Sequence, residues 1–106
     1  MVRYFKLAEK KSALQFSPEG LVKVSVKGRE LCIAKHKNKL FACASKCPHA
    51  GGDLSEGYID SRGNIVCPAH GYKFSLLTGR NVSGEGFSLR IQSVKESLGE
   101  IIIGAE

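Results

Sequence analysis

The chain has 106 residues, of which 42% are hydrophobic and 25% are charged, and its formal net charge is +6. This length fits one small domain. The apolar runs are far too short to cross a bilayer and the N-terminus has no signal-peptide pattern, so we expect a cytoplasmic protein that does not bind a membrane. Zinc-finger spacing, RNP-type aromatic motifs and arginine-rich helices are absent, which disfavours nucleic acid and leaves an acidic protein partner as the favoured use of the charge.

Short apolar alternation, broken by Gly and polar pairs, predicts β structure along most of the chain. No stretch predicts a helix of three turns, and no internal repeat is evident. Lys37-Asn38 is expected to form a hairpin turn within an exposed basic segment that includes His36. The expected strands cover residues 2–7, 21–27, 30–35, 39–44, 58–59, 65–66, 72–75, 88–94 and 100–103, with a short extended piece at 13–16.

Two loops rich in Gly and Pro interrupt this pattern, and each carries one cysteine and one histidine. Cys47 and His49 form a C-x-H motif, and Cys67 and His70 form a C-x-x-H motif, with seventeen residues between the two motifs. Two thiolates and two imidazoles can hold a [2Fe-2S] cluster, with the thiolates on one iron and the imidazoles on the other. They also suit tetrahedral zinc. The C-x-H spacing is tight for chelating one ion, which favours the cluster. A catalytic Cys–His pair is disfavoured, because nothing else in the chain resembles a protease or transferase signature.

The other two cysteines, Cys32 and Cys43, lie within expected strands. Free cysteine often behaves as a small buried hydrophobe, so we interpret both as core residues. Asp53 and Glu56, close to the first loop, are interpreted as solvated.

CPHAGGDL (residues 47–54) and CPAHGYKFSLLTG (residues 67–79) resemble the two cluster boxes of Rieske ferredoxins. The match includes Leu54 after the first box, Phe74 within the second, and the Thr78-Gly79 turn. Leu54, Tyr72 and Phe74 are expected to pack around the cluster and exclude water. The boxes and the residues between them cover about a third of the chain.

The resemblance implies an all-β Rieske fold of three antiparallel sheets, with the cluster at the tip of a small subdomain. We expect a single domain, 1–106, whose basal scaffold covers about 1–44 and 80–106 and whose cluster-binding subdomain covers about 45–79. The resemblance also implies that Cys47 and Cys67 bind the inner iron. His49 and His70 would bind the outer, more exposed iron, through which one electron passes.

The chain departs from the Rieske proteins of respiratory and photosynthetic complexes at four positions. Gly52 and Ala69 occupy the sites of their extra disulfide, so that bridge is absent. Tyr72 and Phe74 occupy the sites of a Ser and a Tyr hydroxyl that hydrogen-bond the cluster or a ligand. Fewer donors stabilise the reduced cluster less, so we expect a potential near the low end of the Rieske range, roughly −150 mV. The loop at 83–86 also lacks the proline often found there.

These features predict an electron-transfer protein rather than a catalyst on its own. The favoured function is a one-electron carrier between a flavin reductase and a terminal oxygenase or a similar enzyme, with docking through an acidic face of the partner. The alternative is a Rieske-like small subunit of a larger enzyme such as assimilatory nitrite reductase. A non-redox metal-binding protein is disfavoured because all four ligands are present.

Overall fold

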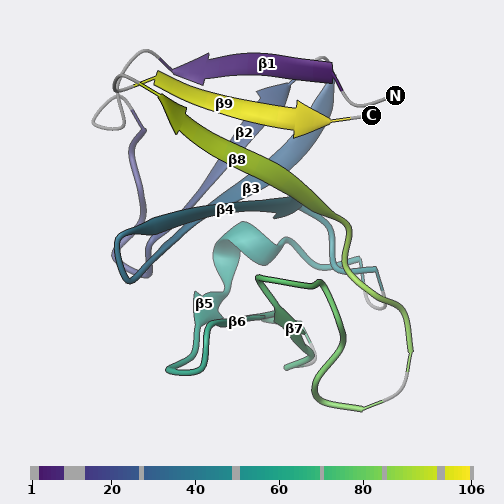
Figure 1. The fold of residues 1–106 in the computed structure, drawn as a ribbon. Helices are drawn as coiled ribbons and strands as arrows, with labels where there is room; N and C mark the ends of the chain where they lie inside the picture. The colour runs from purple at the N-terminus through teal and green to yellow at the C-terminus, as the bar shows by residue number, and fades with distance from the viewer. Residues whose placement is uncertain are drawn as a thin grey trace.

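Antiparallel strands account for nearly all of the regular structure. The structure is a computed structural model that describes residues 3–8, 14–26, 28–48, 51–69, 71–84, 86–97 and 100–105. A larger β lobe carries both termini, and a smaller lobe lies below it in Figure 1. The elements are β1 (Arg3–Ala8), β2 (Leu21–Val26), β3 (Arg29–His36), β4 (Lys39–Ala44), the 3₁₀ helix η2 (Leu54–Glu56), β5 (Tyr58–Ile59), β6 (Asn64–Val66), β7 (Lys73–Ser75), β8 (Ile91–Ser97) and β9 (Glu100–Ala105).

The larger lobe is one six-stranded sheet with the strand order β1-β9-β8-β4-β3-β2. Its two halves, β1-β9-β8 and β4-β3-β2, are joined by a short pairing of β4 with β8 in which Ala42 faces Gln92 and Cys43 faces Ile91. The smaller lobe is a three-stranded sheet in the order β5-β6-β7. The all-β antiparallel prediction is therefore confirmed, and the three expected sheets correspond to these two halves and the small sheet.

Local turn chemistry explains why several predicted boundaries agree with the structure. Lys37 and Asn38 adopt φ values of 50° and 64°, as a two-residue type I′ hairpin requires. The β3–β4 register then pairs His36 with Lys39 across the turn. Between β5 and β6, the Asp60 carboxylate stabilises a turn by accepting hydrogen bonds from the N–H groups of Arg62 and Asn64, at 2.9 and 3.0 Å.

The closing hairpin begins later than predicted, at Ile91 rather than at residue 88. The residues before it bond to other parts of the chain. Leu89 donates its N–H to the Gly79 carbonyl at 2.7 Å, and the Arg90 carbonyl accepts from the Ala44 N–H at 3.0 Å. The expected extended piece at 13–16 forms no strand over its described residues, 14–16.

Strands β3 and β4 separate two hydrophobic cores, which explains why four consecutive residues of β3 are fully buried. Leu31 and Ile33 face the core of the larger lobe, whereas Cys32 and Ala34 face the smaller lobe. Side chains alternate between the faces of a strand, so a strand covered on both faces reads as a continuous apolar run. The core between the lobes contains Leu21, Cys32, Ala34, Cys43, Cys47, Leu54, Ile65, Cys67, Phe74, Leu76 and Leu89.

In the part of the chain that the structure describes, no helix has the length and apolarity that a membrane crossing requires.

Candidate metal centre

The first cysteine loop closes on itself through two backbone hydrogen bonds. Cys47 donates its N–H to the Gly52 carbonyl, and the Cys47 carbonyl accepts from the Gly51 N–H, both at 2.8 Å. Gly51 has a φ of +70°, a conformation that residues with a Cβ rarely adopt. This glycine therefore permits the turn that brings the chain back beside Cys47.

The second loop repeats this pattern position by position. Cys67 donates to the Tyr72 carbonyl at 2.8 Å, and the Cys67 carbonyl accepts from the Gly71 N–H at 2.9 Å, with Gly71 at a φ of +73°. CPHAGG and CPAHGY thus occupy the same six-residue frame, in which His and Ala exchange the third and fourth positions. This short repeat is hidden in the sequence because the two cysteine–histidine spacings differ.

The two loops lie against each other. A Cβ added to Gly52 would lie 3.0 Å from the Cys67 Sγ and 3.1 Å from the Ala69 Cβ. The positions that the resemblance assigns to a disulfide in other Rieske proteins are therefore adjacent here, but they carry no thiol. The glycine leaves room beside the Cys67 sulfur that a larger side chain would fill.

Both loop cysteines are buried, with 2% of Cys47 and none of Cys67 exposed. Their side chains belong to one hydrophobic core with Leu54 and Phe74. Tyr72 packs against this core, as predicted. His49 and His70, the other two predicted ligands, lie outside the described residues. In the sequence, each of them stands between a buried cysteine and a glycine with positive φ, and two Cys with two His is the donor set of a [2Fe-2S] cluster of this kind.

The remaining cysteines, Cys32 and Cys43, are directly opposite each other on β3 and β4 and are fully buried. A hydrogen bond with Cys32, together with burial, raises the pKa of the Cys43 thiol, so that it stays protonated. Both are free thiols that pack at the base of the core between the lobes, as predicted for core residues.

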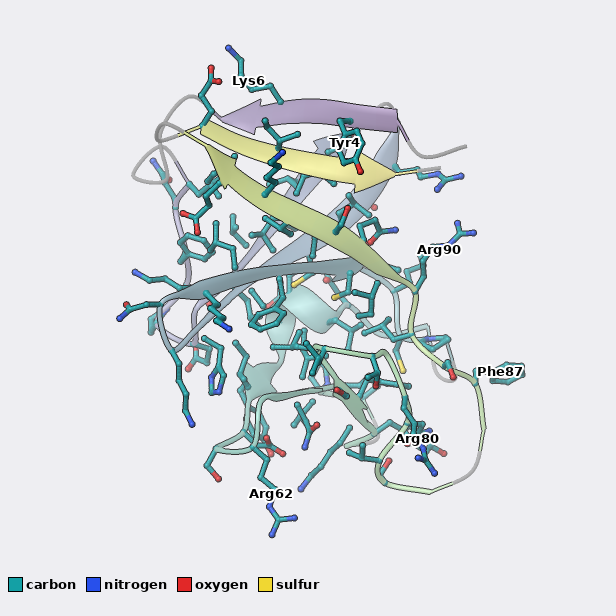
Figure 2. All side chains as sticks on the ribbon, viewed as in Figure 1. Tyr4, Lys6, Arg62, Arg80, Phe87 and Arg90 are labelled. Atoms are coloured by element: carbon teal, nitrogen blue, oxygen red, sulfur yellow. The ribbon has the colours of Figure 1, made fainter. Side chains whose placement is uncertain are left out.

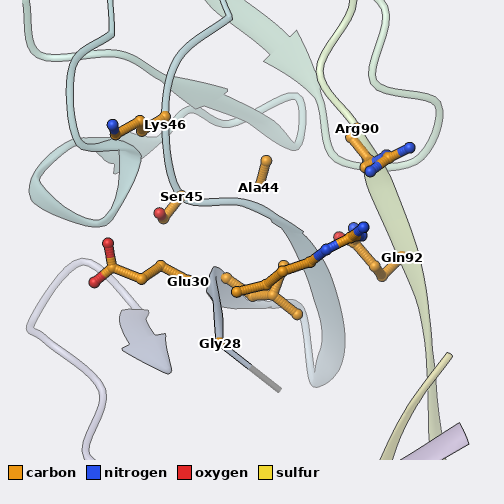
Figure 3. A pocket seen from close by; sticks show the side chains of 9 residues that line it. Gly28, Glu30, Ala44, Ser45, Lys46, Arg90 and Gln92 are labelled. Atoms are coloured by element: carbon orange, nitrogen blue, oxygen red, sulfur yellow. The ribbon is translucent and has the colours of Figure 1, made fainter. Parts of the chain in front are cut away.

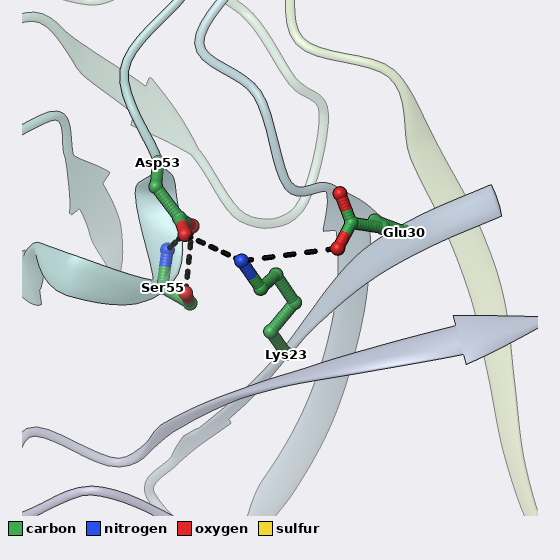
Figure 4. A network of polar contacts seen from close by, with 4 residues as sticks. All are labelled: Lys23, Glu30, Asp53 and Ser55. Carbon is green, nitrogen blue, oxygen red and sulfur yellow. Dashed lines mark hydrogen bonds and ion pairs between the residues drawn. The ribbon is translucent and has the colours of Figure 1, made fainter.

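Asp53 is only partly solvated, whereas a fully solvated side chain was expected. Its carboxylate caps η2, accepting hydrogen bonds from the Ser55 N–H at 3.0 Å and the Ser55 hydroxyl at 2.6 Å. The same carboxylate lies 2.8 Å from Lys23 Nζ on β2, and Glu30 lies 3.8 Å from that nitrogen (Figure 4). The network ties the end of the first loop to the larger lobe. The sequence did contain a signal for the cap, because Asp is a preferred N-cap residue and Ser55 lies two positions after it.

We expect Asp53→Ala to destabilise the protein by about 1 kcal/mol, because it removes the cap of η2. Asp53→Asn keeps a capping oxygen and should lose less at neutral pH. Burial acts to raise the pKa of Asp53, but hydrogen bonds from Lys23 and Ser55 outweigh it and lower that pKa. This stabilisation is present above the ordinary pKa of about 3.9 and is lost as pH falls through the depressed folded value.

Urea denaturation at neutral and acidic pH measures both effects. The stability difference between the native chain and Asp53→Asn should shrink on acidification. A difference that stayed constant with pH would contradict the contribution of the Asp53 charge.

A third segment, which follows β7, is anchored by side chains that sequence reasoning did not single out. The side-chain Oδ1 of Asn81 accepts from the N–H and hydroxyl of Ser83, at 3.0 and 2.7 Å. The Ser83 hydroxyl in turn accepts from the Lys73 N–H at 3.2 Å, and Val82 donates to the Lys73 carbonyl at 2.9 Å. The start of the loop at 83–86 is therefore held against the strand that leaves the second cysteine loop.

His36 is half-buried rather than exposed. A Cβ built on Gly63, in the turn between β5 and β6, would lie 3.5 Å from its imidazole ring. The β3–β4 hairpin therefore contacts the smaller lobe.

Two buried thiols on matched glycine–proline loops, carried by a small antiparallel sheet on a larger one, define an all-β metal-binding domain. A family model for the Rieske [2Fe-2S] domain matches residues 6–91, and the chain belongs to this family. It therefore carries a Rieske [2Fe-2S] cluster.

A curated relative is the ferredoxin component of an alkene monooxygenase system from Xanthobacter autotrophicus. It is 30% identical over 77 residues, which cover 73% of this chain and 63% of the relative. The chain spans less than two thirds of the length of the first curated relatives that it matches.

Two solved structures share the fold. One is a complex of reduced oxygenase and oxidised ferredoxin in carbazole 1,9a-dioxygenase, with a TM-score of 0.79, 27% identity, and coverage of 94% of this chain and 91% of that chain. The other is described as an NADH-dependent nitrite reductase small subunit from Mycobacterium tuberculosis. Its TM-score is 0.84 at 17% identity, with coverage of 100% and 97%.

Proposed function

We propose that this chain is a one-electron carrier that passes electrons from a flavin reductase to a terminal oxygenase or a similar redox enzyme. The carrying observation is the pair of matched loops, which bring Cys47 and Cys67 together in one buried cluster. The comparisons support it, because the similar proteins are named as ferredoxin components of oxygenase systems.

Cys47, His49, Cys67 and His70 are the proposed ligands. The [2Fe-2S] cluster, when bound, accepts and releases one electron. The thiolates of Cys47 and Cys67 would neutralise iron charge in a dry environment, since both side chains are buried with Leu54 and Phe74. The imidazoles of His49 and His70, which are neutral donors, would make reduction easier than two further thiolates would.

We assign the cluster to a subdomain of residues 45–79, carried by a scaffold of 1–44 and 80–106. The small sheet β5-β6-β7 and both cysteine loops fall within the first range. The two lobes share the core that contains Cys32, Cys43, Cys47 and Cys67, so the scaffold packs directly against the cysteine loops.

The partner is proposed to present an acidic face. The net charge of +6 supports this, and so do the positions of Arg62, Arg80 and Arg90, which extend outward from the protein in Figure 2. Phe87, with 64% of its surface exposed, also extends outward and offers an apolar contact. Complementary charge increases the rate of transient docking more than it increases affinity.

The small subunit of a nitrite reductase is the alternative. The similarity to such a subunit, at 17% identity, is a likeness of fold alone and favours neither assignment. Affinity purification from the native cells separates them, because a carrier runs alone and a subunit copurifies in fixed ratio with a large reductase.

Optical and EPR spectra of anaerobically purified protein, oxidised and then reduced with dithionite, test the electron-carrier proposal. We expect a red-brown protein whose reduced spectrum has the low average g value of a histidine-ligated cluster. A redox titration should give roughly −150 mV, because Phe74 is buried beside the loop cysteines without a hydroxyl to donate. A clearly positive potential would contradict this account of the donors.

A further inference from the structure

A pocket of about 280 Å³ opens on the larger lobe where β4 leads into the first cysteine loop. Three segments that are far apart in the sequence form it: the start of β3, the end of β4 and the start of β8 (Figure 3). Leu31 and Ala44 supply its apolar surface. Lys46, which also lines it, directly precedes Cys47, so any occupant would lie beside the proposed cluster loop.

The charge of this pocket is predominantly positive. Arg29, Lys46 and Arg90 line it, and all three are exposed. Glu30 is the one acidic lining residue, and its carboxylate is directed to Lys23 at 3.8 Å. Among the ion pairs of the described residues, none involves Arg29, Lys46 or Arg90. The three cations are therefore available to an anion.

We propose that this pocket receives an acidic loop of the redox partner, and the proposal rests on the electron-carrier function. A side-chain carboxylate of that loop binds between Arg29, Lys46 and Arg90. Arginine pairs strongly with carboxylates because its fork of donors matches their two oxygens. The site therefore positions the partner beside Cys47 and sets its orientation by charge.

Binding of a rhodamine-labelled acidic peptide, capped Gly-Glu-Asp-Glu-Gly, to the intact protein at low salt tests this site by fluorescence anisotropy. The variant Arg29→Gln/Arg90→Gln should bind about tenfold more weakly or worse, because it removes two charge-assisted contacts. The matched control Lys35→Gln/Lys39→Gln removes two exposed charges from the far ends of β3 and β4, so both variants lower the net charge from +6 to +4. The control should bind within twofold of the native chain.

Equal weakening in both variants would show that net charge alone attracts the peptide, and would overturn the pocket assignment. Saturable binding of acetate without binding of the peptide would reassign the pocket to a small carboxylate and also overturn it. The uncharged peptide, capped Gly-Gln-Asn-Gln-Gly, should not bind to any variant.

The peptide measurement does not require electron transfer. If the protein lacked the expected EPR spectrum but bound the peptide, the electron-carrier proposal would be contradicted and the pocket proposal would stand.

Discussion

Cys47→Ser and Cys67→Ser variants are expected to purify without the [2Fe-2S] cluster, whereas Cys32→Ala and Cys43→Ala should retain it. All four cysteines are buried, with exposed fractions of 2% or less, so burial does not distinguish them. The backbone does, because only Cys47 and Cys67 begin the six-residue loops that turn through Gly51 and Gly71. A serine hydroxyl is a much poorer iron ligand than a thiolate, so loss of either one should abolish stable binding.

Iron and acid-labile sulfide content, with the visible spectrum, measure this outcome directly. Cys43→Ala is the matched control, since it removes a buried sulfur from the same core and should cost only about 1 kcal/mol. Retention of a full cluster in Cys67→Ser would disprove the ligand assignment. Loss of the cluster in Cys43→Ala at unchanged stability would assign that thiol to the metal site instead.

Gly57→Ala is expected to destabilise the protein by about 3 kcal/mol or more and to reduce cluster content. Gly57 ends η2 with a φ of −89° and a ψ of −146°, so it does not adopt the left-handed φ that favours glycine. A Cβ at this position, however, would overlap the Val66 carbonyl oxygen. Val66 is the last residue of β6 and directly precedes Cys67, so relieving the overlap would displace the second loop.

Gly28→Ala separates this overlap from backbone strain. Gly28 has a φ of +80°, but a Cβ there would meet nothing within 4 Å. Alanine should therefore cost only about 1–2 kcal/mol for the left-handed conformation, and the cluster should be retained. Urea denaturation of both variants with iron analysis makes the comparison. A larger loss of stability in Gly28→Ala than in Gly57→Ala would rule out the overlap as the dominant effect.

Local sequence patterns were sufficient for the features that depend on a few neighbouring residues. Alternation placed β4 at 39–44, as observed, and Lys37-Asn38 was correctly placed as its hairpin turn. The two cysteine–histidine motifs indicated the cofactor before any fold was known, because ligand chemistry depends on residue type and spacing. Cys32 and Cys43 were correctly interpreted as core residues from their strand positions alone.

Features that depend on distant segments were not predictable in this way. The role of Asp53 required Lys23, thirty residues earlier in the chain, to lie beside it across the two lobes. The late start of β8 followed from hydrogen bonds between residues 89–90 and two other segments. From sequence alone, a charged side chain near a turn is predicted to be solvated, because most charged side chains are exposed. Only the fold reveals a partner from a distant segment.

The shared frame of the two loops and the basic pocket are also features that only the tertiary structure revealed. CPHAGG and CPAHGY show their common frame only when the backbone bonds of Cys47 and Cys67 are compared. The pocket combines Arg29, Lys46 and Arg90, which come together only because β8 pairs with β4 and β4 with β3. The metal-binding residues could be predicted because their types and spacing lie within short stretches of the sequence. The relative placement of charges follows from strand pairing, whose free energy comes from contacts that no short segment contains.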